Sequence, residues 1–253
     1  MTGRPALRIG VVCEGPTDFH AIKNFVAAAL GSEGIAADIF DIQPEMDKKV
    51  AGVNGGWGQV ELWLDKNKPD SRVRHYFNGG PFRFDLSAKA CDLLLIQMDT
   101  DILEDLSFQK RMRRTYKFNV TTPSDPSERG AVIRRVLERW ARVDECGDAD
   151  KRRHIFAPAV ESTETWCVAA FKGKRDTERL RGSALTTAFM GALHRSEGKD
   201  ADGDFQNIDK DVDRRKRFCE KHAAGHKRLR LQCPHFEAVI QSVIDSNSAV
   251  IAR

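Results

Sequence analysis

The sequence predicts an α/β protein with a mainly parallel central sheet that is flanked by helices. Short apolar runs at residues 9–13, 92–98 and 152–160 are bounded by charged, Gly or Pro residues, which is typical of buried strands. Segments such as 17–30 and 128–143 carry apolar residues at helical spacing. Strands that alternate with helices favour a parallel sheet. A chain of 253 residues with 41% hydrophobic residues is long enough to bury a core around such a sheet.

The first predicted strand, residues 9–13, ends in a carboxylate, Glu14. The Gly and Pro that follow turn the chain, and Thr17 is expected to cap a helix that continues to about residue 30. A second strand is predicted at residues 35–42. A charged residue at the carboxyl end of a strand lies where open α/β sheets bind their ligands. Glu14 is therefore the first residue that we associate with a functional site.

The remaining segments divide the chain into two predicted parts. Residues 1–174 are expected to form a catalytic domain, and residues 175–253 a helical extension that packs on it. The Asn-Gly-Gly sequence at 78–80 indicates either a hairpin turn between 73–77 and 82–84 or a plain loop. Further helices are predicted at residues 59–67, 164–171, 183–194, 210–223 and 236–245.

Three of the predicted strands are each followed by two acidic residues. Because the carboxyl ends of parallel strands meet at one edge of a sheet, we expect these acids to form one cluster. Gathered carboxylates repel one another unless a cation neutralises them, and hard oxygen ligands favour Mg²⁺ or Mn²⁺. The sequence therefore predicts a site for divalent cations, two in number, formed by Glu14, Asp18, Asp99, Asp101, Glu161 and Glu164.

An alternative interpretation needs no ligand. Asp18, Glu161 and Glu164 come at predicted helix starts, where an acid complements the helix dipole. Asp99 and Asp101 would then belong to a surface loop. The cluster is favoured because acids follow all three predicted strands at the same end of the sheet.

The acidic motifs resemble those of the Toprim superfamily. Glu14-Gly-Pro-Thr-Asp18, Asp99-Thr-Asp101 and Glu161-Ser-Thr-Glu164 are similar to motifs of the OLD-type nucleases and of small standalone relatives in bacterial defence and mobile-element systems. The resemblance spans roughly residues 7–171. It implies a Rossmannoid core that binds Mg²⁺ and hydrolyses nucleic-acid phosphodiester bonds, with Glu14, Asp99 and Asp101 in catalysis. Such nucleases also use a downstream lysine, for which Lys172 and Lys174 are the candidates.

Other branches of the superfamily fit this chain less well. Topoisomerases need a separate tyrosine-bearing domain, and this sequence has only Tyr76 and Tyr116 and no room for that domain. Bacterial primases carry a zinc ribbon that has no counterpart here. Hydrolysis is the activity that remains, and small relatives commonly work beside an ATPase partner.

Basic residues follow the Asp99-Thr-Asp101 motif, although the net charge of only +4 does not by itself indicate nucleic acid. They are expected on a helix or lid beside the acidic edge, and further arginines lie on the outer face of helix 128–143. We expect these side chains to hold a nucleic-acid backbone, DNA more than RNA; the alternative is a solvated helix face. They are Lys110, Arg111, Arg113, Arg114, Lys117, Arg135 and Arg139.

Two other functions stay open at this point. Asp99-Thr-Asp101-Ile-Leu also resembles the haloacid-dehalogenase motif, in which the first Asp is the nucleophile of a phosphatase. A Toprim fold without turnover, which binds nucleic acid or a partner, is the other alternative. With any of these functions, the chain could form a homo-oligomer.

The six cysteines are scattered and include no C-x-x-C pair, which favours a reduced, cytoplasmic setting. No run is long enough to cross a bilayer, so we expect no membrane partner. A group near the carboxyl terminus has enough ligands for zinc but the spacing of no common zinc module. Its members are Cys219, His222, His226, Cys233 and His235.

Overall fold

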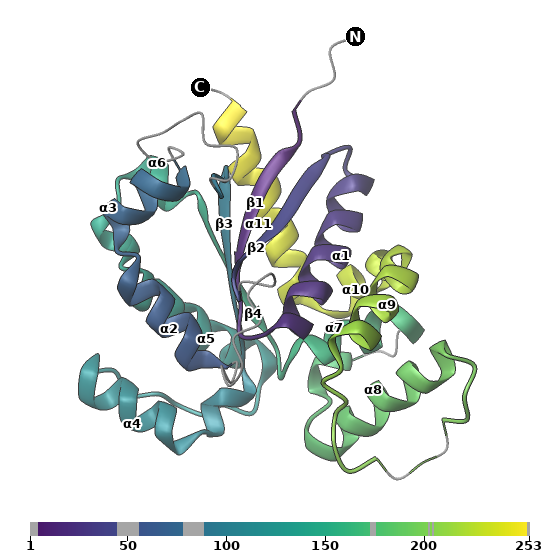
Figure 1. Ribbon diagram of the computed structural model, residues 1–253. Helices are drawn as coiled ribbons and strands as arrows, with labels where there is room; N and C mark the ends of the chain where they lie inside the picture. The colour runs from purple at the N-terminus through teal and green to yellow at the C-terminus, as the bar shows by residue number, and fades with distance from the viewer. Residues whose placement is uncertain are drawn as a thin grey trace.

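A four-stranded, all-parallel sheet in the order β2-β1-β3-β4 forms the centre of the molecule (Figure 1). The computed structural model describes residues 5–44, 56–77, 89–172, 176–201, 203 and 205–251. The predicted α/β class and parallel sheet are confirmed. The strands are β1 (Leu7–Val12), β2 (Ala37–Gln43), β3 (Leu93–Asp99) and β4 (His154–Ala159).

Helices cover both faces of the sheet (Figure 1). On one side α2 and α5 pack against the strands, and on the other side α1 and α11 do so. The carboxyl ends of the strands point toward the end of the molecule where α4 and α8 lie. The helices are α1 (Pro16–Ser32), α2 (Trp57–Lys66), α3 (Pro69–Arg72), α4 (Leu106–Thr115), α5 (Pro126–Ala141), α6 (Asp148–Lys151), α7 (Thr163–Lys172), α8 (Gly182–Ser196), α9 (Val212–His222), α10 (His226–Gln232) and α11 (Pro234–Ile251).

The central strand β3 is buried at every position. Because successive side chains of a strand point to opposite faces, Leu93 and Leu95 enter the core on the α1 side. Leu94 and Ile96 enter the core on the α2 and α5 side. A strand that is buried on both faces carries a continuous apolar run, which is why this segment was recognisable in the sequence.

Two local predictions are wrong. Helix α1 begins at Pro16 with Gly15 as its N-cap residue, and no side chain caps it, so Thr17 lies inside the helix and is buried. Proline suits the first helical position because its missing N–H needs no partner there. The segment Val73–Phe77, expected as one arm of a possible hairpin, forms a π-helical turn. The remainder of that possible hairpin lies outside the described residues.

The carboxyl-terminal helices pack closely on the elements that carry the acidic motifs. Trp166 of α7 is fully buried and meets Phe236 of α11 edge to face, with 5.0 Å between ring centroids. At Gly225, just before α10, a Cβ would overlap the carbonyl oxygen of Ala170 in α7. In the part of the chain that the structure describes, no helix has the length and apolar character needed to cross a bilayer.

We expect Gly225→Ala to lower the free energy of unfolding by about 1–3 kcal/mol, because the new methyl group must push α7 and α10 apart. The matched control is Gly31→Ala in α1, where a Cβ meets no atom within 4 Å. Removing that helical glycine should stabilise the protein by about 0.5–1 kcal/mol. Urea denaturation of both variants measures the difference, and equal stabilities would contradict the close α7–α10 contact.

Candidate functional site

The first two acidic motifs meet between β1 and β3. In the sheet, β2 lies on one side of β1, whereas β3 and then β4 lie on its other side. The direction in which successive strands are added therefore reverses between β1 and β3. Ligands of open α/β sheets bind outside the carboxyl ends of the strands at such a point. Here the backbone N–H of Asp99 donates to Glu14 Oε1 at 2.8 Å across 85 residues of sequence. Asp99 is only 8% exposed, so this contact lies inside the protein.

The third acidic motif, which includes Glu161 and Glu164, contacts the first motif through Asp18. The buried carboxylate of Asp18, in the first turn of α1, accepts a hydrogen bond from Thr163 Oγ1 at 2.6 Å. Thr163 is the first residue of α7, and Glu164 follows it. Asp99 in turn accepts from the side-chain amide of Gln97, which is also buried, at 2.7 Å. The cluster is thus oriented by neutral donors that add no positive charge.

The carboxylates of this cluster raise one another's pKa values. Burial and the charge of Asp18 raise the pKa of Glu14 to about 8. Burial, followed by the charges of Asp18 and Glu14, holds the pKa of Asp99 well above its usual range. Loss of hydration and neighbouring carboxylates raise the pKa of Asp101 to about 6. The negative charges are therefore close enough to oppose one another.

Glu164 is the acid of the cluster that has cationic partners. Its Oε1 lies 2.5 Å from Arg215 Nη2 and 3.1 Å from Lys210 Nζ. Burial favours the neutral acid, but the charges of Arg215 and Lys210 outweigh it and lower the pKa of Glu164. Its other oxygen, Oε2, is buried without a hydrogen-bond partner among the described residues. Glu164 is held as an anion with one oxygen available.

Sequence reasoning missed both of these cations. Lys210 lies just before α9 in a highly charged segment with no periodicity, and Arg215 lies in α9 itself. The lysine that the resemblance implies was sought at Lys172 and Lys174. The side chain of Lys172 is exposed at the end of α7, ~12 Å from Glu164 along the helix axis at 1.5 Å per residue. Lys174 lies outside the described residues.

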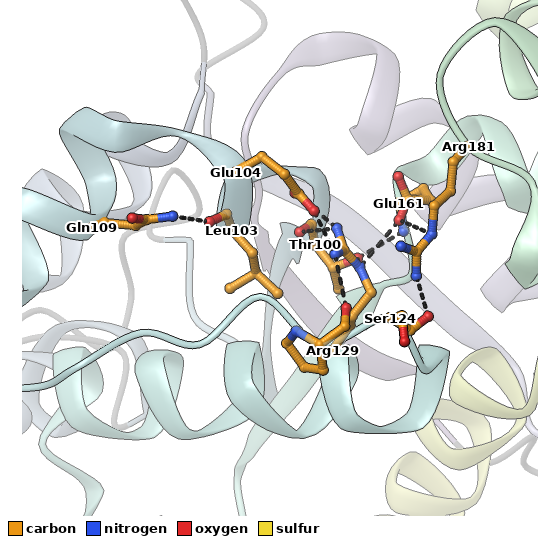
Figure 2. A network of polar contacts seen from close by, with 9 residues as sticks. Thr100, Leu103, Glu104, Gln109, Ser124, Arg129, Glu161 and Arg181 are labelled. Atoms are coloured by element: carbon orange, nitrogen blue, oxygen red, sulfur yellow. Dashed lines mark hydrogen bonds and ion pairs between the residues drawn. The ribbon is translucent and has the colours of Figure 1, made fainter.

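Glu161 belongs to a neighbouring network, which Figure 2 shows. The guanidinium of Arg129 donates to Thr100 Oγ1 at 3.2 Å, to Thr100 O at 2.8 Å and to Glu104 Oε1 at 2.6 Å. Glu161 Oε1 lies 3.1 Å from Arg129 Nε and 3.2 Å from Arg181 Nε. Because Thr100 separates Asp99 from Asp101, this network holds the backbone of the second motif. Glu161 and Glu164 therefore face different partners although they are three residues apart.

Carboxylate oxygens are the type of ligand that a hard divalent cation prefers. Among the described residues, no group of three or more His, Cys, Asp or Glu side chains already converges as a set of metal ligands. The chemistry is nevertheless suitable, because buried carboxylates repel one another and Glu164 Oε2 is unpartnered. The residues that could hold the ion are Glu14, Asp18, Asp99, Asp101 and Glu164.

The possible zinc ligands point to separate partners. Cys219 Sγ lies 3.9 Å from Cys167 Sγ, and His235 Nδ1 lies 2.9 Å from Glu178 Oε2. Within the described ranges they form no group that could hold a metal ion. The residues concerned are Cys219, His222, His226, Cys233 and His235.

The basic residues lie on α4, just after it, and on α5, beside the second motif. Phe108 of α4 packs edge to face on Trp140 of α5, with 6.0 Å between centroids, and so fixes the two helices together. Arg111 is paired with Glu61 at 2.8 Å. The side chains that are exposed are those of Lys110, Arg111, Arg113, Arg114, Lys117, Arg135 and Arg139.

Comparison of the chain with models of protein families, with curated proteins and with solved structures finds no match. The functional argument therefore depends on the geometry of this site and on the motifs that it brings together.

Arg129→Met is expected to destabilise the protein by about 3–5 kcal/mol, because it removes one of the two ion-pair partners of the nearly buried Glu161 carboxylate and the donor to the carbonyl of Thr100. Arg134→Met is the matched control on the same helix; Arg134 is exposed and pairs with Glu138, and its loss should change stability by less than about 0.5 kcal/mol. Urea denaturation tests this. Similar changes in the free energy of unfolding for the two variants would show that Arg129 does not stabilise the backbone of the second motif.

In metal-free buffer, we expect the free energy of unfolding to fall as the pH rises from 5 to 9. The pKa of Glu14 is raised from 4.5 to about 8, so between these values the folded state holds a proton that the unfolded state has lost. This stabilisation is complete below pH 4.5 and is lost as the pH passes about 8. Glu14→Gln cannot ionise and should flatten the dependence.

The measurement is urea denaturation at three pH values in EDTA. Glu138→Gln, at a partly exposed position of α5, is the control and should keep the wild-type slope. A Glu14→Gln slope equal to that of wild type would show that Glu14 does not titrate with a raised pKa.

Proposed function

We propose that this chain is a nuclease of the Toprim type, which hydrolyses nucleic-acid phosphodiester bonds with Mg²⁺ or Mn²⁺. The observation that carries the proposal is the hydrogen bond from the Asp99 N–H to Glu14 Oε1. It joins the two motifs of the resemblance at the reversal of strand order, where an α/β sheet binds ligands. The hydrogen bond between Thr163 and Asp18 brings in the third motif.

The proposed metal ligands follow from these contacts. Glu14, Asp99 and Asp101 would hold one ion, and Asp18 with Glu164 would hold a second. Bound divalent cations supply Lewis acidity toward a phosphoryl oxygen and lower the pKa of bound water. Glu161 is no longer among the ligands that we favour, because Arg129 and Arg181 already engage its carboxylate.

Two side chains have further proposed roles. Glu14 has a carboxyl pKa of about 8 in the metal-free chain, so its Oε2 is suited to accept or release a proton near neutral pH. Lys210 has an exposed side chain whose amino group reaches Glu164. Burial disfavours its charge, yet the acids around it raise its pKa, so it stays cationic. It would stabilise negative charge on a phosphate at the acidic edge.

The exposed basic side chains of α4 and α5 are the proposed contacts to the nucleic-acid backbone. Phosphate contacts position a strand but carry no sequence information, so binding should be weakly specific and sensitive to salt. DNA is the favoured substrate. Action in a cytoplasmic bacterial defence or mobile-element system, beside an ATPase partner, is the context that the resemblance suggests.

Asp99→Asn is the test of this proposal. We expect it to reduce Mg²⁺-dependent cleavage of plasmid and single-stranded DNA by more than the ~10–100-fold that loss of an outer-shell contact costs. Because burial and the neighbouring acids raise the pKa of Asp99 and so favour its neutral form in the metal-free protein, the neutral amide should leave the free energy of unfolding close to that of wild type. Cleavage assays with Mg²⁺ and Mn²⁺ and urea denaturation in EDTA measure the two effects.

Asp148→Asn is the control. Asp148 is exposed in α6, before β4 and thus at the opposite edge of the sheet, and its substitution should leave cleavage unchanged. Undiminished cutting by a folded Asp99→Asn protein would overturn the assignment of the site. A phosphatase would instead release phosphate from a monoester and leave DNA uncut.

A further inference from the structure

Two solvent-facing cations contact acids at or just before the start of α7. Lys210 contacts Glu164, and its side chain is 65% exposed. Arg181 contacts Glu161, and its side chain is 36% exposed. Arg129 contacts the same carboxylate from inside, but it is only 1% exposed and cannot reach a ligand. Arg129 is shared between Glu161 and Glu104, and Arg181 is the second cation of this network and the one that solvent reaches.

Arg181 is fixed close to the second motif. It directly precedes α8, its Nη2 donates to Ser124 O at 2.5 Å, and its Nε faces Glu161 (Figure 2). The backbone carbonyl of Glu161 in turn accepts from the N–H of Asp101 at 3.1 Å. Glu161 therefore links the guanidinium of Arg181, by non-covalent contacts, to the loop that carries Asp99 and Asp101. Burial acts to raise the pKa of Glu104, but the contacts with Arg129 and, to a smaller extent, the charge of Arg181 lower it.

The remaining donors of Arg181 suit a phosphate. A guanidinium has five N–H donors in a fixed plane, and the contacts to Ser124 and Glu161 use only part of them. A planar, permanently charged fork that is partly exposed and held on one edge is a typical binding group for phosphate oxygens. These contacts use Nε and Nη2, and Nη1 has no hydrogen-bond partner among the described residues.

We propose that Arg181 binds the phosphate next to the scissile one, so that the substrate is a polynucleotide and neither a phosphomonoester nor an isolated phosphodiester. This inference rests on the proposed nuclease function and extends it to the substrate class. Lys210 contacts Glu164 and Arg181 contacts Glu161, and a strand with successive phosphates can engage the centre and one of these cations together. A small substrate with one phosphate cannot.

The test compares kcat/KM for a single-stranded oligonucleotide with kcat/KM for bis(p-nitrophenyl) phosphate, which has one phosphodiester only. In Arg181→Gln the ratio of the two values should fall by about 10–100-fold, the equivalent of one lost charge-assisted hydrogen bond. Arg181→Lys keeps the charge but not the fork and should fall between wild type and Arg181→Gln. Arg179→Gln, at an exposed position two residues earlier, is the control and should keep the wild-type ratio.

A second measurement is the salt dependence of oligonucleotide binding, with Ca²⁺ in place of Mg²⁺ so that the strand is not cut. Loss of one phosphate contact should reduce the slope of log K against log[salt] by about 0.7 in Arg181→Gln. Equal loss on both substrates, or an unchanged slope, would overturn the inference while leaving the nuclease proposal intact. A wild-type protein that neither cuts nor binds the oligonucleotide would overturn both.

Discussion

The mutual repulsion of carboxylates at the carboxyl edge of the sheet is the constraint around which this structure is arranged. Parallel strands necessarily end at the same edge, so acids that follow β1 and β3 are brought together by the fold itself. Burial first, and the charges of the neighbouring carboxylates second, raise the pKa values of Glu14 and Asp99. The protein must therefore orient these groups firmly and offset part of their charge, and it uses different residues for the two tasks.

Orientation comes from neutral donors, and charge compensation comes from distant helices. Gln97, Thr163 and the N–H of Asp99 each hold one carboxylate oxygen without adding charge. Arg215 of α9 reaches Glu164 from the interior, where it is also stacked 4.4 Å above the ring of Phe189. Packing of α9 on α1 and α7 is what places that charge. The carboxyl-terminal part of the chain thus contributes directly to the electrostatics of the acidic edge.

The sequence is sufficient to predict those features that a single strand or helix determines by itself. The apolar run of β3 and the acids that follow β1, β3 and β4 could be placed at one edge because strand direction fixes them. Lys210 and Arg215 could not be found, because their role depends on how α9 docks. Glu161 and Glu164 were treated as equivalent, yet the positive φ of 58° at Glu161 turns the chain so that the two side chains face different partners. When the residue is not glycine, nothing in the sequence indicates a positive φ at that position.

The balance of charge explains why this edge suits a cation. Five carboxylates, those of Glu14, Asp18, Asp99, Asp101 and Glu164, face two cationic side chains, and both of these contact Glu164. The acids next to β1 and β3 have neutral hydrogen-bond donors, and Lys210 opposes the rise in the pKa values of Glu14 and Asp101 without reversing it, so their repulsion is only partly relieved from within the described part of the chain. Protonation relieves it in the metal-free protein, as the raised pKa of Glu14 indicates. The divalent cation that we propose at this edge would take the place of those protons and add to the positive charge of Lys210 and Arg215.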